Sequence, residues 1–283
     1  MGWLGPGWLT TARFGLAALV LVALVPRRNL RAAFRGRVLA WGAFGYGGSV
    51  LVQNAGLART SVTHTALIIG AGPVLVALIA ALWGHAVARP VAWAGFALSL
   101  AGAGFIAGGH GGGATGVGDA LVLAATLLAS AMTVAQGDLL AGRDPVAVTT
   151  LQFAAAAAAT LPFALVTEGG PTAPAHFAPL LAVLALTVVG TVAPFTLFAY
   201  GQKHVSAELA GSFLNLEPLV GAVAGVVFFA NPAGPRQLAG GAAIIVGIAL
   251  SSLPLLPGRR RPTPPEVARN TQPIAIKQPS PAH

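Results

Sequence analysis

The chain contains no cysteine and very little charge. Of its 283 residues, 8% are charged and 55% are hydrophobic, and the mean hydropathy is +0.78. The absence of cysteine excludes disulfides and thiolate metal sites. A soluble domain carries about 25% charged residues, so this chain lacks the polar surface to cover a globule in water. We therefore expect its solvent to be lipid.

Acidic side chains are rarer than basic ones, and the formal net charge is +9. The arginines lie between and after apolar runs, which argues against nucleic acid as a partner. The six histidines have no metal-ligand spacing, and no nucleophile–base pair stands out. The composition thus predicts no enzyme, no cofactor and no metal site.

Apolar runs long enough to cross a bilayer fill most of the chain, since a spanning helix needs roughly 20 such residues. We count nine, at residues 8–25, 37–57, 62–83, 91–108, 118–137, 147–166, 179–200, 206–229 and 236–254. The sequence predicts an all-α polytopic membrane protein. Residues 255–283 are rich in proline and without apolar period, so we expect a disordered tail.

The positive residues predict the orientation in the cytoplasmic membrane. Five arginines lie in the loop at residues 26–37, and a further basic cluster follows the last run. Basic loops face the cytoplasm, so this loop and the C-terminus are expected inside. The outer loops then hold only Arg59 and Arg236.

An internal repeat relates the two halves of the chain. Residues 45–106 shifted by 145 positions fall on residues 190–251 without a gap. Backbone-shaping residues stay in register: Gly45 meets Gly190, Pro73 meets Pro218, and Gly102 meets Gly247. Paired prolines argue against a chance match of glycine-rich helices.

The repeat extends upstream at a shift of 139 positions, where "GPGWLTTARF" lies on "RDPVAVTTLQF". The second half then has five spans and the first has four, because nothing matches the span at 118–137. We expect a ten-helix fold of two inverted five-helix repeats, with its first helix missing from this chain. The alternative is a nine-span protein with an outside N-terminus. The predicted units are residues 1–110 and 117–254.

Three stretches carry a family resemblance: the Pro6, Arg13, Phe14 opening of a span, and the paired segments "GLARTSVTHTALIIGAGPVLVALIAALWGHAVARPVAWAGFALSLAGAGFI" and "GQKHVSAELAGSFLNLEPLVGAVAGVVFFANPAGPRQLAGGAAIIVGIAL". The chain resembles the drug/metabolite transporter superfamily, EamA type. The resemblance implies two inverted repeats, a central cavity, and movement of small metabolites across the cytoplasmic membrane.

Glu217 is the outstanding polar residue, because it lies within an apolar run and directly precedes Pro218. A charge at the centre of a spanning helix costs about 2.5–3.5 kcal/mol and indicates a functional site. Pro218 removes the helical partner of the Leu214 carbonyl. Two roles stay open: proton coupling or substrate contact by Glu217, and a structural hydrogen bond by a permanently neutral Glu217. Pro73 and Pro218 are predicted as matched structural kinks.

Other polar residues form helical stripes that should face a cavity or a neighbouring helix. With Glu217 and Asn215, the candidates for substrate or coupling-ion contact are Tyr46, Ser49, Gln53, Asn54, Ser130, Thr133 and Thr191. Hydroxyls in spanning helices more often serve packing. For Arg13 we expect snorkelling to the interface or a structural ion pair, and for His64 an interfacial place.

The function predicted from sequence is secondary transport of a small metabolite or drug-like solute by alternating access, in the direction of export. The alternatives are a flippase for a lipid or lipid-linked substrate and a non-transporting membrane scaffold. The expected partners are the bilayer and a small-molecule substrate. The sequence leaves open whether the protein is a monomer or a homodimer.

Overall fold

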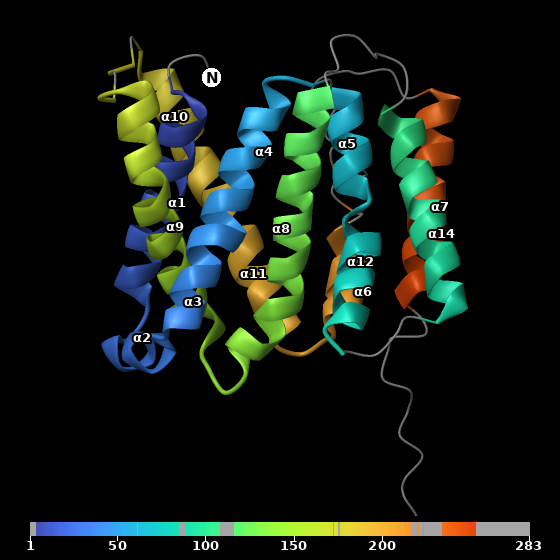
Figure 1. Cartoon of the computed structure of the whole chain (residues 1–283), viewed down its shortest axis with the longest axis horizontal. Coiled ribbons are helices and arrows are strands. Elements are labelled where there is room, and N and C mark those ends of the chain that lie inside the picture. Colours follow the sequence, from blue (N-terminus) through green and yellow to red (C-terminus); the bar gives the residue numbers. More distant parts are fainter. Residues whose placement is uncertain are drawn as a thin grey trace, which may run out of the picture.

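The computed structural model describes residues 4–60, 62–84, 89–107, 116–171, 173–174, 176–214, 216, 220, 223 and 234–252. Within these ranges every regular element is helical. The helices stand side by side in one bundle (Figure 1). Predictions that concern Asn215, Glu217, Pro218 and the tail at 255–283 lie outside the described residues.

The elements follow one another with short connections. In order they are α1 (Pro6–Leu24), α2 (Arg27–Ala33), α3 (Gly36–Trp41), η1 (Gly42–Gly48), α4 (Ser49–Leu57), α5 (Val62–Gly70), α6 (Gly72–Leu82), α7 (Pro90–Ala107), α8 (Gly116–Leu140), α9 (Pro145–Glu168), α10 (Phe177–Thr187), η2 (Val188–Val192), α11 (Ala193–Gln202), α12 (Ala207–Leu214) and α14 (Pro235–Ser252). η1 and η2 are π-helical.

Four helical stretches are long and apolar enough to cross a membrane: Pro6–Leu24, Gly116–Leu140, Pro145–Glu168 and Phe177–Gln202. Shorter apolar helices cover Gly72–Leu82, Pro90–Phe105 and Leu238–Ser251. The all-helical membrane fold predicted from sequence is confirmed. Of the expected span at 206–229, the structure describes α12 and a few single residues.

The backbones of helices α7 and α14 approach each other closely, and we call this contact the α7–α14 clasp. A Cβ atom added at Gly102 would lie 2.6 Å from the Gly240 carbonyl oxygen, and one added at Gly95 would lie 2.5 Å from that of Gly247. Each contact joins a residue of one half to a residue of the other. Applying the 145-residue shift to the pair Gly95–Gly247 gives Gly240–Gly102, so the two contacts are copies of each other. The hydroxyl of Ser99 lies 3.5 Å from the carbonyl oxygen of Ile244. Ile244 is the residue that the 145-residue shift makes equivalent to Ser99.

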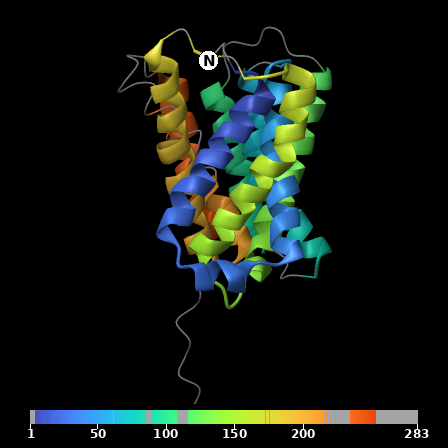
Figure 2. The same cartoon turned by 90° about the vertical axis from the view of Figure 1, so that its left-hand side faces the viewer.

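The helices α1 and α9 form the second clasp between the halves, and Figure 2 shows them beside each other. Phe14 and Phe153 are equivalent under the 139-residue shift, and their ring centroids are 5.2 Å apart. Two equivalent residues can touch only where they lie next to the axis that relates them. Phe14–Phe153 and Ser99–Ile244 therefore mark a pseudo-twofold axis through the bundle, as an inverted repeat requires.

The two π-helices occupy equivalent places in the two halves. Shifted by 145 residues, η1 at 42–48 covers 187–193, which encloses η2 at 188–192. In the same way α7 (Pro90–Ala107) coincides with α14 (Pro235–Ser252). π-helical turns are rare and frequently mark functional sites. Their equivalent positions confirm the two-repeat architecture. They also make η1 and η2 the segments of each half where we look for a functional site.

The halves differ in what covers these segments. Gly45 and Gly56 lie against α8, where an added Cβ would be 2.7 Å from the sulfur of Met132 and 2.8 Å from Val122 Cγ2, respectively. Their equivalents are Gly190 and Gly201. An added Cβ at Gly201 meets no described atom within 4 Å, and one at Gly190 meets only Leu186 of the preceding helix. α8 thus packs closely against Gly45 and Gly56 in the first half, whereas no other helix among the described residues lies that close to Gly201.

The helix break at Pro73 has a simple form. α5 ends at Gly70, Ala71 is a turn residue, and α6 begins at Gly72 with Pro73 in its first turn. Proline is tolerated there because its missing N–H has no helical partner in any case. One helix therefore ends before Pro73 and a new helix begins there, instead of a single continuous helix being bent at the proline.

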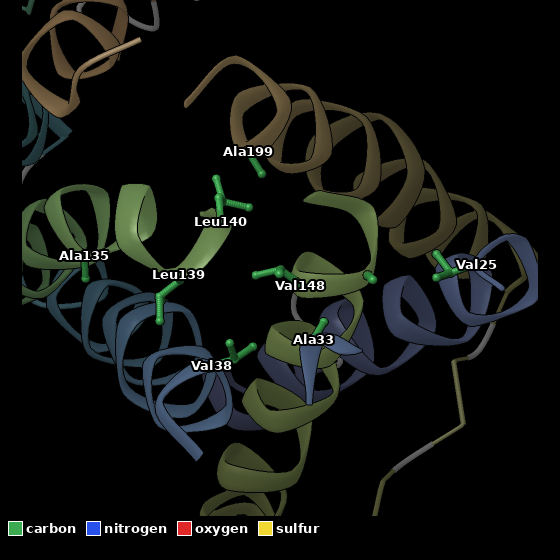
Figure 3. Close-up of a cluster of buried hydrophobic side chains, with 9 residues drawn as sticks. Val25, Ala33, Val38, Ala135, Leu139, Leu140, Val148 and Ala199 are labelled. Carbon is green, nitrogen blue, oxygen red and sulfur yellow. The ribbon is translucent and has the colours of Figure 1, made fainter. Parts of the chain in front are cut away.

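One end of the bundle carries α2 and the α8–α9 turn, and we call it the Arg-rich end (Figure 1). A cluster of buried apolar side chains lies at this end, contributed by five helices and by Val25, which directly follows α1 (Figure 3). Its members are Val25, Ala33, Val38, Ala135, Leu139, Leu140, Ala147, Val148 and Ala199. The cluster fixes α2 and α3 against α8 and α9 at the Arg-rich end.

Candidate functional site

Arg13 of α1 reaches across to the π-helix of the other half. Its Nε donates to the Thr191 hydroxyl at 2.5 Å, and its Nη2 donates to the Gly190 carbonyl at 2.8 Å. The guanidinium carbon lies 5.6 Å from the ring centre of Phe14 and 5.7 Å from that of Phe195. The snorkelling predicted for Arg13 is wrong: the side chain points to η2, in the middle of the Phe177–Gln202 span.

The π-turn explains why a cation is stable at this depth. Thr191 donates to the carbonyl of Leu186 at 2.9 Å, five residues earlier, and so accepts from Arg13 with its remaining capacity. The widened turn leaves the Gly190 carbonyl in a position to accept a second bond. Charge-assisted bonds and the faces of two aromatic rings replace the hydration of the guanidinium.

An aromatic cluster lies next to Arg13 and joins the two halves. The Tyr46 ring of η1 lies 5.1 Å from the Phe195 ring in an edge-to-face arrangement and 5.7 Å from the Phe153 ring. Tyr46 and Thr191 are equivalent under the repeat, and both were predicted as site residues. The structure brings them to one cluster with Arg13, so the candidate site is where η1, η2 and α1 meet.

The α4 candidates differ in how their polar atoms are used. The Ser49 hydroxyl donates to the carbonyl of Gly45 and lies 3.2 Å from that of Tyr46, so it serves the backbone of η1. Asn54 donates from Nδ2 to the Thr10 hydroxyl of α1 at 3.2 Å. Gln53 is half-buried. Asn54 therefore adds a contact between α1 and α4, on the side of the bundle opposite the Arg-rich end.

On α8 the two hydroxyl candidates are buried and bound to backbone. Ser130 lies 3.4 Å from the carbonyl of Gly72, at the helix break before Pro73. Thr133 donates to the carbonyl of Ala129 at 2.9 Å. These contacts favour a packing role for Thr133. Ser130 couples α8 to the break, and Gly72 is the repeat equivalent of Glu217.

Three buried glutamines near the Arg-rich end were not among the predicted residues. Gln136 and Gln152 exchange amide bonds at 3.1 and 2.8 Å, and both are fully buried. Gln202 donates to the carbonyl of Thr133 at 2.9 Å. The repeat offered a signal for Gln152, because the 139-residue shift places it on Arg13. These amides link α8, α9 and α11 below the aromatic cluster.

A second polar cluster lies at the opposite end, between α5 and α8. The Asp119 carboxylate accepts from the Thr60 hydroxyl and lies 2.8 Å from Nδ1 of His64. The side chains of His64 and Asp119 are partly exposed. The interfacial place of His64 stays a prediction. No group of His, Asp and Glu suited to a metal ion occurs among the described residues.

A bundle of apolar helices related by a pseudo-twofold axis, with a polar site where the halves meet, is the architecture of membrane proteins built from inverted repeats, a class in which secondary transporters are common. The model of the EamA-like transporter family matches residues 3–108 and 116–253, and the chain belongs to this family. Its long apolar helices and its family make the bilayer its environment.

A curated protein and a solved structure are also similar to this chain. A protein of Archaeoglobus fulgidus described as "Uncharacterized transporter" is 37% identical over 68 residues, which are 24% of this chain and 25% of that protein. The match therefore spans about a quarter of that relative. A solved structure described as "Crystal structure of protein" shares the fold, with a TM-score of 0.77 at 23% identity over 90% of this chain and 89% of that one.

Proposed function

We propose that the protein exports a small amphipathic or amino-acid-like metabolite by alternating access of its two repeats. The observation that supports this most directly is the meeting of Tyr46, Thr191 and Arg13 at the paired π-helices. Such a site between inverted repeats is where secondary transporters bind substrate. We place the Arg-rich end in the cytoplasm, because basic loops remain on that side.

Glu217 is the proposed proton carrier, and its repeat relationship supports the choice. The equivalent position in the first half is Gly72, which is buried and whose carbonyl lies within 3.4 Å of the Ser130 hydroxyl. The first half therefore has a helix break without a carboxyl group, and the second adds one at the same place in the sequence. A protonated Glu217 can donate a hydrogen bond, while an ionised one can bind a substrate amine. Alternation between these states would couple export to proton entry.

Flux measurements in proteoliposomes test the proposal. The purified protein is reconstituted and given an imposed pH gradient, and the movement of labelled amino acids and small amphipathic amines is followed. We expect gradient-driven flux of at least one of these solutes. Glu217→Gln should abolish the response to the pH gradient, because an amide cannot release a proton.

Glu266→Gln is the matched control, since it removes a carboxylate that lies outside every apolar run. It should leave flux unchanged. A Glu217→Gln protein that still follows the pH gradient would exclude Glu217 as the carrier. Export moves the solute away from the side of the membrane that holds the Arg-rich end. Flux only toward that side would exclude the proposed direction.

A further inference from the structure

A charged cavity lies at the Arg-rich end, apart from the site between the halves. Its volume is about 240 Å³, and it opens between the start of α3 and the α8–α9 turn. It is lined by Arg35, Gly36, Arg37, Val38, Asp138, Leu139 and Arg143. Three guanidinium groups and one carboxylate give this lining a net charge of +2.

Two of the three arginines of this cavity, Arg143 and Arg35, donate to backbone carbonyls. Arg143 donates to the carbonyl of Leu139 at 3.0 Å and lies within 3.4 Å of those of Asp138 and Ala141. Arg35 donates to the carbonyl of Phe34 at 3.1 Å. Among the described residues, the ion pair within 4.0 Å is His64–Asp119, at the other end. Within that part of the chain, Asp138 therefore offsets one of the three positive charges, and no ion pair within 4.0 Å neutralises the other two.

The inner wall of the cavity is apolar. Val38 is 0% exposed and Leu139 is 3% exposed, and both belong to the cluster of Figure 3. Packing into that cluster fixes the backbones that carry the neighbouring charges, Arg37 beside Val38 and Asp138 beside Leu139. The cavity is therefore built on a rigid support.

An exposed strip leads from the cavity toward the middle of the bundle. Arg37, Ala40 and Phe44 follow one another at intervals of three and four residues along α3 and η1, and all three are exposed. Phe44 is 68% exposed. Trp41 and Trp83, with ring centroids 6.0 Å apart, lie at the same end of the bundle, as aromatic residues do at the membrane–water boundary. The strip thus changes from charged to apolar as it passes that boundary.

We propose that this cavity binds the phosphate of an anionic membrane phospholipid, whose acyl chain lies along Ala40 and Phe44. Arginine matches the geometry of phosphate oxygens, and basic pockets between spanning helices bind anionic headgroups. Orientation by basic loops accounts for arginines at this end, but it requires neither a cavity nor an apolar strip beside it. The volume is below the roughly 300–1,000 Å³ of sites for whole small molecules, so it suits a headgroup.

Native mass spectrometry of the full chain in detergent tests the site with a defined probe. Phosphatidylglycerol is added, and phosphatidylcholine and inorganic phosphate are added in parallel. We expect phosphatidylglycerol adducts in clear excess over phosphatidylcholine adducts. Millimolar inorganic phosphate should not displace the lipid, because it cannot occupy the apolar strip.

The variant pair R35Q/R37Q and R27Q/R28Q makes the comparison sharp. Both remove two exposed arginines from the same basic segment, but only the first pair lines the cavity. R35Q/R37Q should lower phosphatidylglycerol binding by about tenfold or more, since two charges that attract the anionic headgroup are removed. R27Q/R28Q should lower it clearly less. Thermal unfolding confirms that each variant is folded, and Arg37→Gln alone replaces the double variant if that one unfolds early.

Three results would overturn the proposal. Equal losses in the two double variants mean that diffuse charge attracts the lipid. Equal adducts with phosphatidylcholine mean that the headgroup charge is not recognised. Displacement by inorganic phosphate means that the site binds free anions and not a lipid.

Discussion

Phe14 and Phe153 are repeat equivalents, and their rings are packed against each other with centroids 5.2 Å apart. Their contact places the pseudo-twofold axis inside the aromatic cluster, beside Arg13 and Tyr46. The polar residues around this axis come from both halves. A movement of one half against the other would therefore change the surroundings of Arg13.

Glycine substitutions at one repeat pair should have opposite effects. Gly56→Ala places a methyl group 2.8 Å from Val122 Cγ2 and 3.0 Å from its amide nitrogen. We expect a loss of about 1–3 kcal/mol in the free energy of unfolding, as for overpacked cores. Gly201→Ala meets no described atom within 4 Å. It should be neutral or stabilise by up to about 1 kcal/mol through helix propensity.

Denaturant titration of the two alanine variants in mild detergent measures both values. Equal losses at Gly56 and Gly201 would contradict the difference in packing between these two glycines.

Glu168 should stabilise the start of α1 although it lies at the end of α9. Its carboxylate accepts from the amides of Gly7 at 2.6 Å and Trp8 at 3.0 Å, which the helix itself leaves unpaired. Glu168→Ala should cost about 1–3 kcal/mol, because bonds to charged groups exceed ordinary capping bonds. Thermal unfolding followed by tryptophan fluorescence measures the loss.

Thr167→Ala is the control for Glu168, since the Thr167 hydroxyl bonds only within its own helix in the described contacts. It should shift the midpoint far less. Similar shifts in the two variants would rule out the cap.

Arg13 and Thr191 should be energetically coupled. Arg13→Gln removes a charge-assisted bond to η2, and Thr191→Val removes its acceptor. Each single variant should destabilise the protein, and the double variant should lose less than their sum. We expect a coupling of about 0.5–3 kcal/mol in a double-mutant cycle.

The pair Arg13 and Thr11 supplies the reference cycle, because the Thr11 hydroxyl bonds to Thr160 and not to Arg13. Its coupling should be near zero. Strict additivity of Arg13→Gln and Thr191→Val would show that their bond does not contribute to stability.

The α7–α14 clasp should tolerate no side chain at its glycines. Gly102→Val would drive methyl groups into the Gly240 carbonyl, 2.6 Å from the Cβ position. It should prevent folding or cost more than about 3 kcal/mol, since backbone cannot give way as a side chain can. The neighbouring Ala101 is exposed, so Ala101→Val should be nearly neutral. Yield and monodispersity in detergent report on both.

Hydropathy predicted the positions of several helices. The run expected at 147–166 is α9 at Pro145–Glu168, and that expected at 91–108 is α7 at Pro90–Ala107. Glycine and proline in register predicted the equivalence of the halves, because these residues shape the backbone directly. The π-helices were not predicted, since a turn of that kind changes hydrogen bonding without changing hydropathy.

Contacts between distant helices were the part that sequence could not supply. Glu168 and Gly7 are 161 residues apart, and nothing in either segment indicates the other. The environment of Arg13 required knowing that η2 presents a carbonyl and a hydroxyl to α1. Tyr46 and Thr191 were chosen for polarity at helical spacing, but their shared place followed only from the fold. The role of Glu217 stays a prediction.

The clasp of α7 and α14 has the form that an isologous interface has in a dimer, although both surfaces belong to one chain. Gly95 meets Gly247 as Gly240 meets Gly102, so each kind of contact is present twice. A residue type that fits one of these contacts therefore fits the equivalent position of the other contact as well. A chain carrying a single repeat could have made the same clasp with a second copy of itself, provided that the two copies entered the membrane in opposite directions.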